Sequence, residues 1–185
     1  MSLDLIERLA PSRRASIIDV GGGESTLVDD LLARGYENVT VLDISDTAID
    51  ANKKRLGKPS ELVHWLVADV TKIELEPTAY DVWHDRAVFH FLTEAADRLA
   101  YVRQVARAVR HGGHVIVSTF GPEGPTKCSG LEVVRYDAES LHGEFGVSNS
   151  PRPPLGRCFR PHRSCRRHVC RACTCRSDRR GQQQR

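Results

Sequence analysis

The sequence predicts an α/β protein with a doubly wound, mostly parallel sheet, and three observations carry this prediction. Segments with the pattern of buried strands alternate with segments of helical spacing over residues 3–145. The apolar run at 17–20 is followed by three glycines and a helix start, an arrangement that suits a ligand carrying phosphate or ribose groups. Acids stand at or just past the ends of four predicted strands: Asp19, Asp43, Asp69 and Asp85.

The first half of the chain is expected to alternate helix and strand. Apolar residues at helical spacing predict a helix over 3–9, which Pro11 stops. Ile17, Ile18 and Val20 form a run typical of a buried parallel strand. The elements expected next are a helix over 27–32 capped by Ser25 or Thr26 and closed by Gly35, a strand over 39–42, a helix over 48–56 capped by Ser45 or Asp46 and closed by Gly57, with Ala48, Ile49, Ala51 and Leu56 inward, and a strand over 62–67.

The second half continues the alternation as far as residue 145. A strand over 80–84 precedes a long helix that begins at Thr93, with Leu99, Val102, Val105, Ala106 and Val109 at helical spacing. Gly112-Gly113 is expected to turn the chain into a strand over 114–120, and Asp137 to cap a short helix that contains Leu141 and Phe145. Trp65 and Trp83 lie on predicted strands and are expected in the core. Residues 1–146 therefore form one predicted domain.

Composition divides the chain sharply near residue 146. Residues 1–146 carry 16 Lys and Arg against 23 Asp and Glu, whereas residues 147–185 carry 11 Arg and a single acid, Asp178. Five of the six cysteines also lie in the second segment. No run of residues is long and apolar enough to cross a membrane, and the N-terminus lacks a signal peptide, so we expect a cytoplasmic protein.

The segment 147–185 has no window that reads as a strand, and three interpretations are open. The first is an out-of-frame translation, because Arg, Pro, Cys, Ser and Gly without Lys or Ile are typical of a shifted GC-rich frame. The second is a zinc site of Cys165, Cys170, Cys173, Cys175, His162 and His168, and the third is a disordered basic tail that binds nucleic acid. In the first case Val115–Val117 would be an unprotected sheet edge prone to aggregation.

The strand-end acids can be given roles from their chemistry. A carboxylate at Asp43 can accept both hydroxyls of a ribose, the alternative being a helix cap. Asp69 can accept a hydrogen bond from an exocyclic amine such as that of adenine, the alternative being a turn-stabilising acid. Asp19 can orient the loop or meet a cationic end of the ligand through water, and it can also bond the backbone amides of the loop; these roles do not exclude one another. A dinucleotide fingerprint would need glycine at Thr26, which argues against NAD.

Taken together, the motifs resemble those of a known family. The segments Asp19–Ser25, Asp43, Ala68-Asp69-Val70, Tyr80–Asp85 and His111–His114 resemble, in order and spacing, the motif series of class I S-adenosylmethionine-dependent methyltransferases. The resemblance covers about residues 3–146 and implies a Rossmann-like sheet, from which we expect the family's last strands to be missing here. Ser25 replaces the family's third loop glycine, and Arg110-His111 replaces its usual Lys-Pro.

The resemblance implies S-adenosylmethionine as cofactor and assigns residues to it. Asp19, Gly21 and Gly23 would line the methionine end, Asp43 would hold the ribose with Ile44 against the adenine, and Asp69 and Val70 would hold the adenine. His84 lies on the same edge. Asp85 matches the position that faces methionine and acceptor, so the catalytic candidates are Asp85 and His90. For His84 and His90 the alternatives are a packed histidine and a histidine on a helix surface.

The acceptor-facing stretch is expected at Asp85–Phe91, where Arg86 either holds an acidic substrate or pairs with a nearby carboxylate. Residues 1–146 are acidic, and an Asn-Pro-Pro-Tyr motif is absent after the fourth strand, so the sequence predicts a small-molecule methyl acceptor and no nucleic acid except through the basic tail. The alternatives are a nucleotide-binding or interaction module without catalysis and an NAD-dependent oxidoreductase. The domain itself is expected to need no metal.

Overall fold

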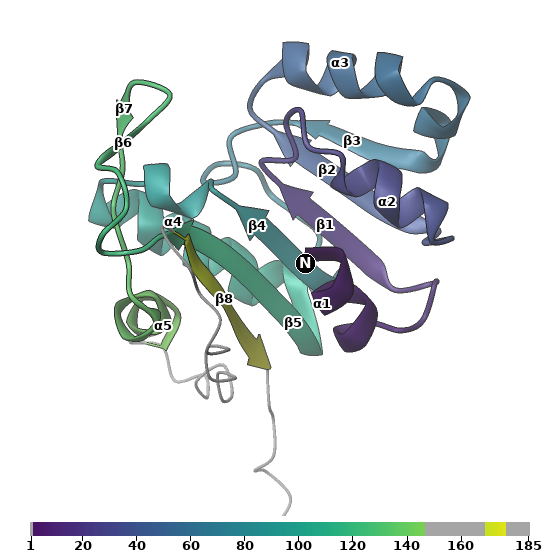
Figure 1. The fold of residues 1–185 in the computed structure, drawn as a ribbon. Coiled ribbons are helices and arrows are strands. Elements are labelled where there is room, and N and C mark those ends of the chain that lie inside the picture. Colours follow the sequence, from purple (N-terminus) through teal and green to yellow (C-terminus); the bar gives the residue numbers. More distant parts are fainter. Residues whose placement is uncertain (1, 147–168, 177–185) are drawn as a thin grey trace, which may run out of the picture.

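The computed structural model describes residues 2–146 and 169–176 (Figure 1). The elements, in chain order, are α1 Ser2–Leu9, β1 Ser16–Val20, α2 Leu27–Ala33, β2 Asn38–Asp43, α3 Asp46–Leu56, η1 Lys58–Leu62, β3 Val63–Val67, β4 Tyr80–Arg86, η2 Phe89–Phe91, α4 Ala95–Ala108, β5 Val109–Phe120, β6 Lys127–Cys128, β7 Leu131–Glu132, α5 Ala138–Gly146 and β8 Val169–Arg176. The alternation of strands and helices predicted from the sequence is confirmed.

The main sheet has the order β3-β2-β1-β4-β5-β8. The first five strands are parallel, and Ile17 of β1 pairs with Val39 of β2 on one side and with Val82 of β4 on the other. Strand β8 is antiparallel to β5. The doubly wound, mostly parallel fold class is therefore confirmed.

Strand β8 corrects the expectation that no strand follows residue 146. Its backbone pairs with β5 over His114–Phe120, so Val115–Val117 is not an open edge. The physical reason is that an edge strand is recruited by backbone hydrogen bonds, which need no alternating apolar pattern. Three further hypotheses were a shifted reading frame, a zinc site and a disordered tail. They concern residues 147–168 and 177–185 and the side chains of β8, all of which lie outside the part of the chain that the structure describes.

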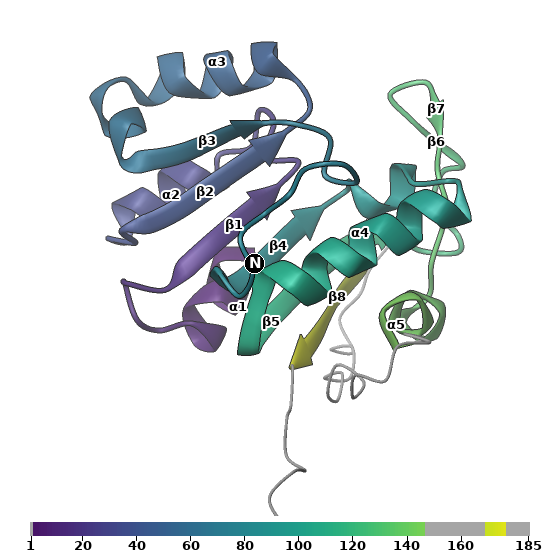
Figure 2. The same cartoon turned by 180° about the vertical axis from the view of Figure 1, so that it is seen from behind.

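Side chains of alternate strand residues form two apolar cores, one on each face of the sheet. Ile17, Val41 and Ile116 pack with α1, α2 and α3, whereas Ile18, Trp83 and Val117 pack with α4 and α5. Figures 1 and 2 show α1 and α2 on one face of the sheet and α4 on the other. This two-sided burial explains why the strands read as continuous apolar runs.

Three local expectations differ from the structure. Strand β5 already begins at Val109, so Gly112 and Gly113 lie within it, near a register irregularity against β4. The hairpin β6–β7 was not predicted, since each strand has only two residues. Ala51, which was expected to point inward, is exposed, and so are Leu99 and Ala106 of the helically spaced set, because helical spacing alone does not fix how wide the buried stripe is.

Removing β8 should destabilise the sheet. A chain ending at Gly146 exposes the edge of β5, so we expect aggregation and a thermal midpoint lower by roughly 10 °C, equivalent to a few kcal/mol in a domain of this size. Thr174→Pro in the full chain should act in the same direction, because Thr174 pairs with Ile116. The control is Gln182→Pro, which lies beyond β8. Equal thermal midpoints for the chain ending at Gly146, Thr174→Pro and Gln182→Pro would contradict the pairing of β8 with β5.

Candidate functional site

The predicted site residues gather where the parallel strands end. The arrowheads of β1, β2 and β4 point to a common edge in Figure 1. Asp19, Asp43 and Asp85 lie near the ends of these three strands, and Asp69 follows β3 by two residues. In parallel sheets this edge is where ligands bind. Two surface hollows of the described residues lie elsewhere, one between α4 and α5 and one beside α2 and η1.

The glycine loop is held tightly between β2 and the segment after β4. The Gly21 N–H donates to the Leu42 carbonyl at 2.7 Å. A Cβ on Gly21 would stand 2.0 Å from Val88 Cγ2, and one on Gly22 would stand 2.5 Å from Val41 Cγ1. Gly21 also has φ +70°, which favours glycine. No side chain fits at the first two loop positions, so the backbone itself forms the surface there.

Asp43 fixes the loop to the start of α3. Its Oδ2 accepts the Gly23 N–H at 2.7 Å, and its Oδ1 accepts the Ser45 N–H at 2.8 Å. Ser45 caps α3, since its hydroxyl accepts the Ala48 N–H. Each carboxylate oxygen still has a free lone pair. The carboxylate is thus held in one orientation and keeps the capacity to accept two further hydrogen bonds.

Asn52 contacts the glycine loop, and the sequence did not lead us to predict this contact. It is fully buried on α3, and its Nδ2 donates to the Gly23 carbonyl. Its Oδ1 is buried without a hydrogen-bond partner among the described residues. A signal was present: Asn52 stands three residues after Ile49 and four before Leu56, so it is a polar residue on the inward face of a helix.

Asn52→Ala should loosen the glycine loop and weaken ligand binding at this edge. The Gly23 carbonyl loses its donor, which we expect to lower the affinity for a nucleoside ligand about 10-fold, equivalent to about 1.4 kcal/mol. Calorimetric titration with S-adenosylhomocysteine measures this. Lys53→Ala, one residue further along the same helix, is the control. Equal affinities for the two variants would show that Asn52 does not hold the loop.

The residues predicted around a base lie beside this loop. Ile44 is 73 % exposed and Val67 is 52 % exposed, so two apolar side chains stand open where β2 and β3 end. Val70 is buried in the core instead. Asp69 Oδ1 accepts hydrogen bonds from the backbone and hydroxyl of Thr71, and Lys72 pairs with Oδ2 at 3.0 Å. These bonds lower the pKa of Asp69, and the hydrogen bond from the Thr71 hydroxyl has the largest effect. They are the bonds expected if Asp69 stabilises the turn, which was the alternative to binding adenine.

Asp19 and His84 form a buried pair at the end of β1 and β4. The two residues are register partners, and His84 Nδ1 lies 2.7 Å from Asp19 Oδ1. Asp19 Oδ2 and His84 Nε2 are buried without hydrogen-bond partners among the described residues. A Cβ on Gly22 would approach Asp19 Oδ2 to 3.2 Å, so the pair lies directly under the loop. Two polar atoms there remain able to hydrogen-bond.

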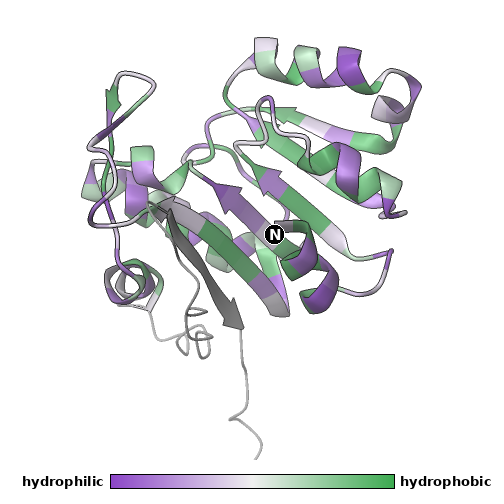
Figure 3. Cartoon of the chain, viewed as in Figure 1, coloured by the Kyte–Doolittle hydropathy of each residue, from purple (hydrophilic) through white to green (hydrophobic). Residues whose placement is uncertain are grey.

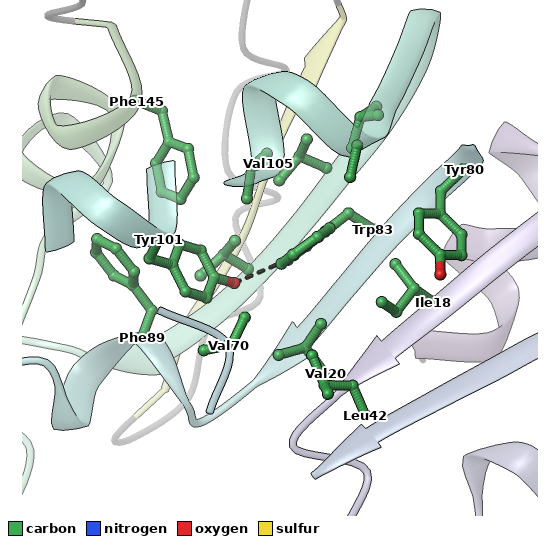
Figure 4. Close-up of a cluster of buried hydrophobic side chains, with 14 of the residues drawn as sticks. Ile18, Val20, Leu42, Val70, Tyr80, Trp83, Phe89, Tyr101, Val105 and Phe145 are labelled. Atoms are coloured by element: carbon green, nitrogen blue, oxygen red, sulfur yellow. Dashed lines mark hydrogen bonds between the residues drawn. The ribbon is translucent and has the colours of Figure 1, made fainter. Parts of the chain in front are cut away.

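Asp85 is not at the surface of the site. It is fully buried, and its carboxylate accepts the N–H groups of Val88 and Phe89 and the hydroxyl of Tyr101 at 2.6 Å. Tyr101 in turn accepts the Trp83 indole N–H at 2.8 Å (Figure 4). Burial raises the pKa of Asp85 to about 6. The expectation that this side chain faces the acceptor is corrected: alternation along β4 puts it on the core face with Trp83.

His90 lies in η2 and is fully buried, so the helix-surface alternative is wrong. Its ring stacks on Phe120 at 4.8 Å between centroids and meets Phe91 edge-on at 4.5 Å. Neither ring nitrogen has a hydrogen-bond partner within the described ranges. Burial lowers the pKa of His90, so the imidazole is held in its neutral form.

Comparison with known proteins gives one family model, a methyltransferase domain, that matches residues 18–117. Nodulation protein S of Rhizobium tropici is 27 % identical over 124 residues, covering 67 % of this chain and 50 % of the relative. The malonyl-[acyl-carrier protein] O-methyltransferase of a Paenibacillus species is 24 % identical over 148 residues, covering 77 % and 51 %. The chain thus spans about half the length of these curated relatives.

The fold is also similar to solved structures. One is phosphoethanolamine N-methyltransferase 2 of Haemonchus contortus in complex with phosphomonomethylethanolamine and S-adenosylhomocysteine. It is 19 % identical with a TM-score of 0.63, and the match covers 77 % of this chain and 35 % of that one. At this sequence identity the match supports a shared fold and nothing further. Within residues 2–146 and 169–176, no helix combines the length and hydrophobicity required to cross a bilayer.

Proposed function

The chain belongs to the class I S-adenosylmethionine-dependent methyltransferase family, and from this premise we propose that it transfers the methyl group of S-adenosylmethionine to a small-molecule acceptor. The observation that carries the proposal is the glycine loop locked against Val88 and Val41 beside the fixed carboxylate of Asp43. Such a loop lets a ligand touch backbone atoms directly, and the carboxylate can accept ribose hydroxyls.

The residues at the edge fit this cofactor. Asp43 would accept the ribose hydroxyls, and exposed Ile44 would cover one face of the adenine. Asp69 and Val70 would border the adenine, although the carboxylate of Asp69 already serves the turn to Thr71. Gly21, Gly23, Asp19 and His84 would border the methionine end, where Asp19 Oδ2 and His84 Nε2 have hydrogen-bonding capacity left. When bound, the cofactor supplies an activated methyl group on a sulfonium.

The protein's part in the reaction is alignment, dehydration and, where the acceptor must lose a proton, base catalysis. His90 is proposed as the base, because its imidazole is neutral and neither ring nitrogen has a hydrogen-bond partner among the described residues. Asp85 is proposed as a positioning residue: its carboxylate holds the backbone of Val88 and Phe89, immediately before His90. The charge balance of residues 1–146, 16 Lys and Arg against 23 Asp and Glu, supports a small acceptor rather than nucleic acid.

Calorimetric titration of the full chain with S-adenosylhomocysteine tests the proposal, with NADH as the control ligand. Micromolar binding of S-adenosylhomocysteine alone is expected, and a panel of small amines, alcohols and acids with the labelled cofactor should then reveal an acceptor. A folded chain that binds neither ligand would exclude the methyltransferase. Binding without transfer to any acceptor class would favour the alternative of a binding module without catalysis.

A further inference from the structure

Arg86 is a cation at the candidate site that no described carboxylate neutralises. It is the last residue of β4 and is exposed, next to buried Asp85. Figure 3 shows β4 hydrophilic where its neighbours β1 and β5 are largely hydrophobic. Among the described residues Lys72 is paired with Asp69, whereas no ion pair involves Arg86. The alternative reading, in which Arg86 pairs with a neighbouring carboxylate, is therefore not observed in this part of the chain.

Asp85 cannot serve as the partner of Arg86. It is fully buried, and the hydrogen bonds from Val88, Phe89 and Tyr101 hold its carboxylate on the core side of β4. Alternation along the strand places Arg86 on the opposite face, the one that carries His84. The guanidinium thus stands on the same side of the sheet as the Asp19–His84 pair.

The backbone around Arg86 is fixed rather than loose. Ala87 follows it with φ +80°, a conformation that costs a non-glycine residue about 1 kcal/mol. The Ala87 N–H donates to the Ser118 carbonyl at 3.0 Å, and Val88 packs against Gly21 of the glycine loop. The strained backbone at Ala87 thus connects Arg86 to Val88, the residue that contacts the glycine loop. This is the kind of backbone that is kept where a side chain must be presented.

We propose that Arg86 binds an anionic group, a carboxylate or a phosphate, in the site. This inference rests on the proposed function and adds that a group bound in the site is negatively charged. A guanidinium offers paired N–H donors that match both groups. An unpaired cation beside a sulfonium would repel it, and an anion between them removes that cost. The anion comes either from the methionine carboxylate of the cofactor or from the acceptor.

The test compares two ligands that differ in the amino acid moiety. S-adenosylhomocysteine carries the carboxylate and 5′-methylthioadenosine lacks it. Each is titrated calorimetrically into the wild-type chain, Arg86→Gln, Arg86→Lys and the control Arg103→Gln, an exposed arginine on α4. Inorganic phosphate is also titrated, at constant ionic strength, into the free chain and into the chain saturated with S-adenosylhomocysteine.

Two outcomes support the proposal and separate the sources. If Arg86→Gln weakens S-adenosylhomocysteine at least about 10-fold but methylthioadenosine less than about 2-fold, Arg86 holds the cofactor carboxylate. If S-adenosylhomocysteine is unaffected but phosphate binding to the saturated chain is lost in Arg86→Gln, Arg86 holds the acceptor. Arg86→Lys should keep part of the affinity in either case, and Arg103→Gln all of it.

The remaining outcomes overturn the proposal. Equal loss for both nucleosides would make Arg86 a structural residue, and no change in any arm would make it a surface cation. These failures differ from a failure of the proposed function, in which the wild-type chain does not bind S-adenosylhomocysteine at all. Phosphate titration of the free chain then still decides the role of Arg86, since binding that is absent or unchanged in Arg86→Gln excludes an anion site.

Discussion

Gly21→Ala should reduce the affinity for S-adenosylhomocysteine about 100-fold or more, equivalent to about 3 kcal/mol. The new Cβ would stand 2.0 Å from Val88 Cγ2, closer than two carbon atoms can approach, and at φ +70° alanine is strained as well. The loop or η2 must move to relieve the overlap. Either movement displaces the backbone that the ligand is expected to touch. Calorimetry gives the affinity, and thermal unfolding shows whether the variant is folded.

A matched control separates overlap from backbone strain. Gly35 has φ +80°, and nothing lies within 4 Å of the Cβ it would carry. Gly35→Ala therefore has the strain without the overlap, and it should cost about 1 kcal/mol of stability with no change in affinity. Adding Val88→Ala to Gly21→Ala removes the obstructing methyl groups and should restore about 10-fold of the lost affinity. Equal affinities for Gly21→Ala and Gly35→Ala would refute the loop's assigned role.

The sequence predicted what depends on local chemistry. The glycine loop, the strand-end position of Asp43 and the Ser45 cap are each encoded by neighbouring residues, and all three are found as expected. Strands buried on both faces leave long apolar runs, so the order of elements was readable too. These features need no knowledge of how distant segments meet.

The residues that were misjudged depend on three-dimensional packing. Asp85 was assigned to the acceptor because it follows a strand end, but it shares the face of Trp83, and Tyr101 from α4 completes its burial. Asn52 contacts a loop 29 residues away, which helical spacing does not reveal. Strand β8 is recruited by the open edge of β5 rather than by its own side-chain pattern. In each case a partner distant in sequence decides the outcome.

The buried carboxylate of Asp85 leads to a prediction about pH. Burial raises its pKa from 3.8 to about 6, against the opposing hydrogen bond from Tyr101. Between these two values the folded state binds more protons than the unfolded state, so the stabilisation present below pH 4 is lost as pH rises through about 6. A difference of about 2 pKa units corresponds to about 3 kcal/mol. Asp85 should thus lower the free energy of unfolding by this amount between pH 4 and pH 7.

Asp85→Asn isolates this contribution. Other groups titrate in the same range, and His90 acts in the opposite direction, because its lowered pKa makes the folded state lose stability as pH falls. The difference between wild type and Asp85→Asn cancels His90. Asparagine keeps an acceptor but mismatches one of the three donors, so the variant should be less stable than wild type at pH 4. The deficit should shrink by about 3 kcal/mol by pH 7, measured by urea unfolding at each pH. A difference that stays constant over this range would mean that Asp85 remains ionised in the core, sustained by Tyr101 and the two backbone N–H groups.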